Sequence, residues 1–446
     1  MPCSVSHDRR ALDMGRREFL RLVGLAAAGL ASGCAVNPVT GRSQLMLVSE
    51  QDEIRIDQEN RAHQFSADYG AVQDGPLNDY VNRTGLNIAS FTHRSQMPYS
   101  FRAVNAPYVN AYAFPGGSIA CTRGILLELE NEAQLAALFG HELGHVNARH
   151  TAQQMSKGML VSAAMGGISR AASTGDTILG DLVSGIGGLG AGALLAKYSR
   201  DNEREADSLA LAYMVRAGYG PEGMVGLMDM LRKASSKSPS ALELMFSTHP
   251  MSGERYDMVK REVESRYRND RGRPVYRERY MDRTAGLRSV RGAIESMQAG
   301  DKAMGEKDLN GADDHYRKAL REAPNDYTAL VKCAECGLAR KRYPEARRFA
   351  ETAKAVYPRE ARAYYVSGIS RILEKDWDGA FGEFSAYDDR LPGNPNTAFL
   401  KGFSLEGMGR KRDAAQEYHR YLQVVSSGDQ ARYAYNRLVE WGYVKP

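Results

Sequence analysis

The sequence predicts an α+β fold that is mostly α-helical and divided into two parts. A histidine-containing segment at 130–150 carries apolar residues at helical spacing, and the last third of the chain repeats every 34 residues. Ahead of the histidines, apolar and β-branched residues flank Pro115-Gly116-Gly117, which predicts a small β element with a tight turn. At 446 residues, the chain is long enough for two separate hydrophobic cores.

The segment at 130–150 contains the pattern HELGH at 141–145. On an α-helix, a four-residue offset turns one side chain about 40° from the other and raises it about 6 Å. His141 and His145 therefore leave one face of the helix and can share a zinc ion. Glu142 then lies beside the metal, where a general base takes a proton from the attacking water.

A third ligand is expected from a second helical stretch, SRDNEREAD, in which Glu203 and Asp207 stand four residues apart. Catalytic zinc keeps three protein ligands, and two histidines with one glutamate are a standard set. Asp207 is expected to accept a hydrogen bond from the far ring nitrogen of a ligating histidine. A solvated helix charge is its alternative interpretation. Glu205 fits the ligand role less well, because it lies about 200° around the helix from Glu203.

These segments resemble the BepA and HtpX type of zinc metallopeptidase, peptidase family M48, and in particular its exported members with tetratricopeptide repeats. The resemblance also covers NPVTGRSQLMLVS at 37–49, VNAYAFPGGSIACTRGIL at 109–126 and STHPMSGER at 247–255. It implies a gluzincin-like metallopeptidase domain that binds one Zn²⁺ ion per chain. It assigns Glu142 as the catalytic base and implies three zinc ligands, which are His141, His145 and Glu203.

The resemblance implies a regulatory role for His249, because the matching histidine of the exported members can approach the metal as an extra ligand and hold the enzyme shut. From the residues alone, His249 is a histidine at the end of a helical run, and a surface position is the alternative. Arg255 and Tyr256 are less specific candidates for stabilising the oxyanion, a task that needs a donor aimed at developing negative charge. Both have a structural role as the alternative.

The stretch around Pro115 also bears on substrate binding. Metallopeptidases of this kind bind substrate as an added strand on an exposed sheet edge, because backbone hydrogen bonds capture any extended peptide. The alternative is a structural hairpin.

Residues 1–34 predict an export signal with a candidate lipobox. Residues 16–33 combine a basic flank with a short apolar run that ends in small residues. RREFLR resembles a twin-arginine signal and ASGC resembles a lipobox, so Cys34 is the expected site of lipid attachment. The expected location is the periplasm, with a lipid anchor in the outer membrane, and Met14 is an alternative initiator.

The repeat predicts the second domain. Four helical hairpins at 292–427 would stack into a tetratricopeptide α-solenoid, with 428–446 as a capping helix. The metallopeptidase domain is then expected at 35–265 and a charged linker at 266–291. Small residues and prolines recur at the 34-residue step, namely Ala312, Ala346, Ala380, Ala414, Pro324, Pro358 and Pro392.

The net charge of +5 argues against strong binding to polyanions. The basic run at 266–283 carries interleaved tyrosines, and a solvated linker or a lipid-headgroup contact is favoured over a nucleic-acid patch. We therefore expect no nucleic acid among the partners. Cys333 and Cys336 are expected either as a local disulfide or as packing thiols. In the Gly- and Ala-rich segment at 158–196, the longest stretch without charged residues is too short to cross a membrane. We expect a mobile helical lid there.

Together these features predict an exported zinc endopeptidase, and the resemblance implies that it cleaves misfolded or unassembled envelope and outer-membrane proteins. The repeats would recruit unfolded clients or the β-barrel assembly machinery. The competing hypothesis is a repeat-based chaperone or scaffold with a latent or structural zinc site.

Overall fold

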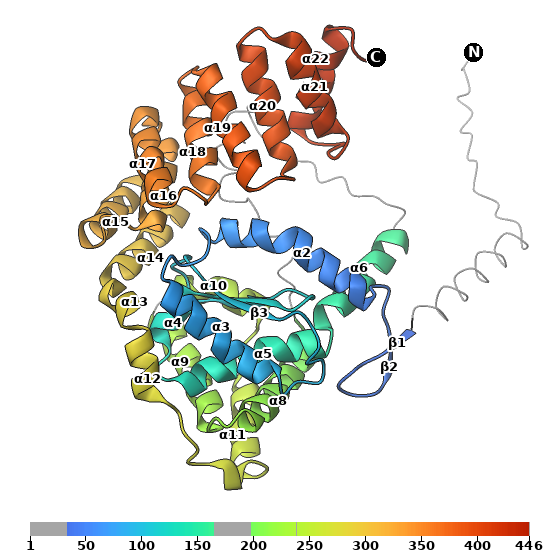
Figure 1. Cartoon of the computed structure of the whole chain (residues 1–446), viewed down its shortest axis with the longest axis vertical. Helices are drawn as coiled ribbons and strands as arrows, with labels where there is room; N and C mark the ends of the chain where they lie inside the picture. The colour runs from blue at the N-terminus through green and yellow to red at the C-terminus, as the bar shows by residue number, and fades with distance from the viewer. Residues whose placement is uncertain (1–33, 165–197, 238, 446) are drawn as a thin grey trace, which may run out of the picture.

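The computed structural model describes residues 34–164, 198–237 and 239–445, in which a largely helical first domain is followed by an arc of helical hairpins (Figure 1). The predicted fold class, mostly α with a small β element, is confirmed. The predicted export signal at 16–33 and most of the predicted lid at 158–196 lie outside the described residues. Within the described ranges, no helix is both long and apolar enough to cross a membrane.

The first domain begins with a two-stranded antiparallel ribbon and two helices, followed by a small sheet. The strand order in the sheet is β3-β5-β4, with β3 parallel and β4 antiparallel to β5, so β4 is an edge strand of the described sheet. The elements are β1 (Cys34–Val36), β2 (Ser43–Leu45), α2 (Glu50–Ala67), α3 (Gly75–Ala89), β3 (Ser100–Val104), β4 (Ala111–Ala113) and β5 (Ser118–Thr122).

Helices that follow the sheet carry the histidines and the acidic residues of interest. Helix α5 begins after Asn131, whose side chain accepts a hydrogen bond from the backbone N–H of Gln134, and every residue of this helix is buried. The histidines of the HELGH pattern therefore lie in the interior. The helices of this part are α4 (Arg123–Glu128), α5 (Glu132–Asn147), α6 (His150–Ala164), α8 (Arg200–Arg216), α9 (Glu222–Lys237), α10 (Pro239–Thr248) and α11 (Gly253–Glu264).

Helices α5 and α8 cross at very short range because small residues line both. A Cβ atom at Gly140 would lie 3.0 Å from the Cα atom of Ala210, and one at Gly144 would lie 2.9 Å from the Cα atom of Ala206. The two glycines and the two alanines are each four residues apart, so they form matching stripes along the crossing. This close approach brings the HELGH pattern of α5 against the acidic face of α8.

The segment expected as a charged linker, 266–291, is instead folded onto the first domain. It forms η2 (Arg268–Asp270), α12 (Arg277–Arg283) and α13 (Ala285–Ser289). Tyr280 is fully buried, and its hydroxyl donates a hydrogen bond to the carbonyl of Leu126 at 2.6 Å. The physical reason is that the rings of Tyr267 and Tyr280 bury apolar area that a count of charges overlooks.

Four helical hairpins and a closing helix make up the second domain. In three hairpins, a glycine of the first helix faces an aromatic ring of the second, so that a Cβ at Gly300, Gly368 or Gly402 would collide with Tyr316, Phe384 or Tyr418. The helices are α14 (Arg291–Gly305), α15 (Leu309–Glu322), α16 (Tyr327–Ala339), α17 (Tyr343–Val356), α18 (Arg362–Leu373), α19 (Trp377–Arg390), α20 (Pro395–Gly407), α21 (Lys411–Leu422) and α22 (Asp429–Glu440).

The repeat array is docked on the first domain through buried polar contacts. Arg123, the first residue of α4, pairs with Asp326 before α16 through two contacts of 2.6 and 3.0 Å. Arg362 of α18 donates a hydrogen bond to the carbonyl of Ala67 at the end of α2 at 3.0 Å. Figure 1 shows the array rising from α14 beside the first domain and passing α2.

Candidate metal centre

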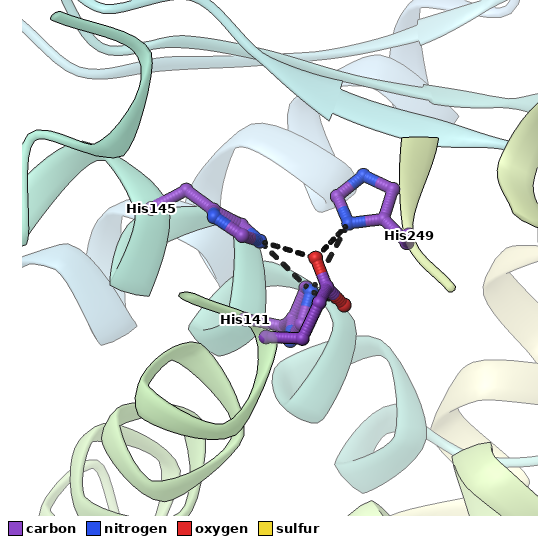
Figure 2. A group of neighbouring side chains, drawn as sticks. His141, His145 and His249 are labelled. Atoms are coloured by element: carbon purple, nitrogen blue, oxygen red, sulfur yellow. Dashed lines mark hydrogen bonds and ion pairs between the residues drawn. The ribbon is translucent and has the colours of Figure 1, made fainter. Parts of the chain in front are cut away.

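Four side chains meet between α5, α8 and the residue that follows α10 (Figure 2). His141 Nε2 lies 3.1 Å from His145 Nε2 and 3.5 Å from Glu203 Oε2. His249 Nδ1 lies 3.3 Å from His141 Nε2 and 3.1 Å from Glu203 Oε1. All four residues are buried, and their ligand atoms lie within 4.8 Å of one another.

The donor set and its spacing fit a zinc ion. Zinc bonds of about 2.0–2.1 Å in a tetrahedron place neighbouring ligand atoms about 3.3 Å apart. The contacts of His141 and Glu203 with the other ligand atoms, at 3.1–3.5 Å, match this spacing. The adjacent Glu142 has two buried carboxylate oxygens for which the described part of the chain offers no hydrogen-bond partner. An unpaired buried carboxylate is costly, so these oxygens need a water molecule or a cation beside them.

The pKa shifts in the cluster differ in direction. Burial would lower the pKa of His249, but the adjacent carboxylates of Glu203 and Glu142 outweigh it and raise that pKa. Burial lowers the pKa of His145 well below its usual value, which keeps the imidazole in the neutral form that binds metals. Burial raises the pKa of Glu142 above that of an ordinary glutamate, although the adjacent His249 and His141 oppose the rise. Burial would also raise the pKa of Glu203, but the adjacent histidines His249 and His141 outweigh it and lower that pKa strongly.

Asp207 and Arg255 lie directly behind the cluster. Asp207 Oδ1 lies 2.9 Å from His141 Nδ1, the ring nitrogen that faces away from the other three residues. The guanidinium of Arg255 donates to both carboxylate oxygens of Asp207 at 2.7 Å, pairs with Glu203 at 2.6 Å and donates to the carbonyl of Pro250 at 2.9 Å. Arg255 thus holds the acidic residues of α8 in place, and three of its five donors are engaged in hydrogen bonds.

Tyr256, the other residue considered for the oxyanion, packs elsewhere: the guanidinium of Arg232 lies 4.6 Å from its ring centre.

Among the cysteines, Cys34 is the first residue of β1. Cys333 and Cys336 are buried free thiols on α16, so the structure has the packing alternative and not the disulfide.

Sequence reasoning missed two residues that contact His145. The ring of Tyr198 stacks on its imidazole with centroids 3.7 Å apart, and its backbone N–H donates to the carbonyl of Thr248 just before His249. The other is His150, whose Nδ1 lies 2.9 Å from His145 Nδ1. The only signal for His150 was a histidine five residues after His145, a spacing that does not share a helix face.

An HExxH helix, a glutamate from a neighbouring helix and a small sheet define a gluzincin-like metallopeptidase domain, here joined to a helical repeat array. Residues 76–263 match the model of peptidase family M48, and residues 303–367 match a tetratricopeptide repeat model. The chain therefore carries a peptidase family M48 domain followed by tetratricopeptide repeats.

Three curated relatives illustrate the similarity. The beta-barrel assembly-enhancing protease of Escherichia coli (strain K12) is 26% identical over 258 residues, which are 57% of this chain and 51% of that protein. A putative beta-barrel assembly-enhancing protease of Vibrio cholerae is 30% identical over 195 residues, 41% of this chain and 38% of that protein. Metalloprotease YcaL of Escherichia coli (strain K12) is 28% identical over 218 residues, 49% of this chain and 79% of that protein. The chain thus spans about half the length of the first relative.

Proposed function

We propose that this protein is a zinc-dependent endopeptidase that cleaves unfolded or misassembled proteins of the cell envelope. The observation that carries the proposal is the cluster of four ligand atoms within 4.8 Å beside the Glu142 carboxylate, which accepts no hydrogen bond from the described residues. In this proposal His141, His145 and Glu203 hold the ion, and His249 occupies the position that substrate and water need.

Glu142 has the chemistry of a general base and acid. A bound zinc ion would supply a Lewis acid that polarises the scissile carbonyl and makes water more acidic. Glu142 takes a proton from the attacking water and later passes it to the leaving amine, a role that its raised pKa suits. Its carboxylate has no hydrogen-bond partner among the described residues, so both oxygens are available.

The free edge of β4 supports binding of substrate as an added strand. Phe114 N–H donates to the Ser118 carbonyl at 2.8 Å, and Thr122 N–H donates to the Asn110 carbonyl at 3.0 Å. Hydrogen-bonded positions alternate along an antiparallel pair, so the backbone groups of Ala111 and Ala113 point away from β5. No other described strand pairs with β4 on that side.

The name of the relatives supports the clients and partners that we propose. The chain resembles beta-barrel assembly-enhancing proteases, and its repeats provide a second surface for protein recognition. We propose that the repeats recruit unfolded clients or the β-barrel assembly machinery. We also propose that the protein works in the periplasm, anchored to the outer membrane through a lipid on Cys34.

Two isosteric variants test the enzymatic proposal. Glu142→Gln should keep the bound zinc and reduce cleavage of an unfolded protein such as casein by at least about 100-fold, because general acid–base catalysis contributes that much. Glu203→Gln should lose both zinc and cleavage, because it removes a ligand. Metal analysis and a peptidase assay on the purified protein measure both. Zinc binding without cleavage in the wild-type protein and in His249→Ala would instead favour the repeat-based scaffold with a latent or structural site.

A further inference from the structure

His145 is the first member of a chain of three side chains that leads away from the metal centre. Its Nδ1 lies 2.9 Å from Nδ1 of His150, and Nε2 of His150 lies 3.2 Å from Oε2 of Glu205. His150 is completely buried, whereas the Glu205 side chain is 28% exposed. The chain therefore runs from the interior of the domain to a partly solvated carboxylate on α8.

A strained turn places His150 against His145. Helix α5 ends at Asn147. Arg149 then adopts a left-handed backbone conformation with φ of 59°, which residues other than glycine rarely take. Arg149 is held there by an ion pair with Glu53 at 3.1 Å and a hydrogen bond to the carbonyl of Val48 at 2.8 Å. The turn starts α6 at His150 and directs its imidazole back to His145.

The hydrogen-bond roles along the chain follow from the requirement of a ligand. His145 presents Nε2 to His141 and Glu203, so Nε2 must be unprotonated to bind a metal, and Nδ1 then carries the proton. His150 accepts that proton's hydrogen bond at Nδ1 and donates from Nε2 to Glu205. On this basis, we propose that His150 is a positioning residue that fixes the tautomer and orientation of the zinc ligand His145, with Glu205 as the terminal acceptor.

The two histidines of α5 thus end on carboxylates of the same helix, but in different ways. His141 reaches Asp207 directly at 2.9 Å. His145 reaches Glu205 only through the intervening imidazole of His150. Partners of this kind raise the basicity of a ligating histidine, and their loss typically costs about 10–100-fold in metal affinity. The inference rests on the proposed zinc site.

Zinc affinity, measured by competition with a chromogenic chelator, tests the chain without reference to cleavage. His150→Leu, which removes the acceptor, should weaken zinc binding about 10–100-fold. His150→Gln should recover most of that affinity, because its amide can accept from His145 and donate to Glu205. Glu205→Ala should weaken binding by a smaller factor. Thr352→Ala, on a distant exposed helix face of α17, is the control and should leave affinity unchanged.

The tautomer of His145 can also be measured directly. A purely structural role for His150 would leave that tautomer unchanged. In the zinc-loaded wild-type protein, nitrogen-15 NMR should show a protonated Nδ1 on His145 with slow exchange with water. Exchange should accelerate in His150→Leu and recover in His150→Gln. Equal zinc affinity and equal exchange in wild type and His150→Leu would overturn the inference. Failure of the wild-type protein to bind zinc would instead refute the proposed function.

Discussion

In the proposed function, the imidazole of His249 lies where a substrate carbonyl and a water molecule would have to enter. Its Nδ1 is within 3.3 Å of both His141 Nε2 and Glu203 Oε1, and its Nε2 is 3.8 Å from Glu142 Oε1. A group in this place completes the ligand set and faces the general base as well. In the proposed function, His249 must therefore move before cleavage.

Replacing His249 by alanine should therefore raise the rate of cleavage. If the closed arrangement is favoured by about 1.4 kcal/mol, the rate should rise about tenfold, because that free energy corresponds to a factor of ten in the population of the open state. Three protein ligands remain, so the variant should keep its zinc. The measurement is initial cleavage rate per bound zinc. An unchanged rate with zinc retained would argue against a latch.

At the residue scale, the sequence predicted those roles that depend on spacing within one helix. The four-residue offsets placed His141 with His145 and Glu203 with Asp207 on common faces, and the structure brings these four residues together. The sequence pattern could not predict the role of His150, because that residue reaches the site only through the left-handed turn before α6. The partners of the Arg255 guanidinium could not be predicted either, since they depend on how α11 packs against α8.

At the element scale, the crossing of α5 and α8 sets the distance between the histidines and Glu203. Alanine in place of glycine inside a helix normally stabilises by about 0.5–1 kcal/mol. At Gly144 the added Cβ would lie 2.9 Å from the Cα atom of Ala206, so backbone must move.

Gly144→Ala should accordingly destabilise the protein by about 1–3 kcal/mol, as overpacking does, and weaken zinc binding because the ligands move apart. Thermal unfolding and zinc titration measure the two effects. Gly382→Ala is the matched control, because Gly382 lies within α19 and a Cβ there meets nothing within 4 Å. The control should be neutral or more stable. A stabilised Gly144→Ala variant with normal zinc affinity would contradict this account of the crossing.

The edge strand β4 can be tested by removing one backbone donor. Ala113→Pro deletes an N–H that points away from β5, so the sheet itself loses no hydrogen bond, as edge strands tolerate. If substrate adds a strand there, cleavage should fall up to about tenfold for the lost hydrogen bond. Ala113→Val, which keeps the N–H at similar bulk, should cleave normally. Equal rates for the two variants, measured with an unfolded substrate, would place the substrate elsewhere.

The repeat array shows which structural features the 34-residue sequence repeat predicts and which it does not. The 34-residue step predicted small residues at the helix contacts, and Ala312, Ala346, Ala380 and Ala414 are all fully buried. The turns within the hairpins follow the same step but were not predicted. Three of them use a lysine with positive φ, namely Lys307, Lys341 and Lys375. Glycine is the usual residue there, so composition alone hides the turn.

At the scale of the whole molecule, α2 connects the repeats with the small sheet of the first domain. Near its C-terminal end, Ser66 donates a hydrogen bond to Glu360, and Ala67 accepts one from Arg362. Further toward its N-terminus, Asp57 accepts a hydrogen bond from the backbone N–H of Ser118 in β5 at 2.8 Å. A shift of the repeats would thus be transmitted through α2 to β5 of this sheet.

Asp326 anchors the array from the other side. Burial would raise the pKa of Asp326, but the facing Arg123 guanidinium and the hydrogen bonds to the carboxylate lower it below its ordinary value. The folded state therefore gains stability above the ordinary pKa of the carboxyl group, and that stability is lost as the pH falls toward the lowered pKa. The pair should hold the two domains together at neutral pH and weaken below about pH 4.

Asp326→Asn should destabilise the docked repeats by about 3–5 kcal/mol at neutral pH, because it leaves Arg123 buried without a counterion. Asparagine still caps α16, so the helix itself should persist. Hydrogen–deuterium exchange should accelerate at the contact between α4 and α16, and the difference from wild type should shrink on acidification. Asp308→Asn makes the same change at the cap of α15, where Asp308 has no ion-pair partner among the described residues. It should have little effect on exchange, and equal effects of both substitutions would show that the cap and not the ion pair fixes the repeats to the peptidase domain.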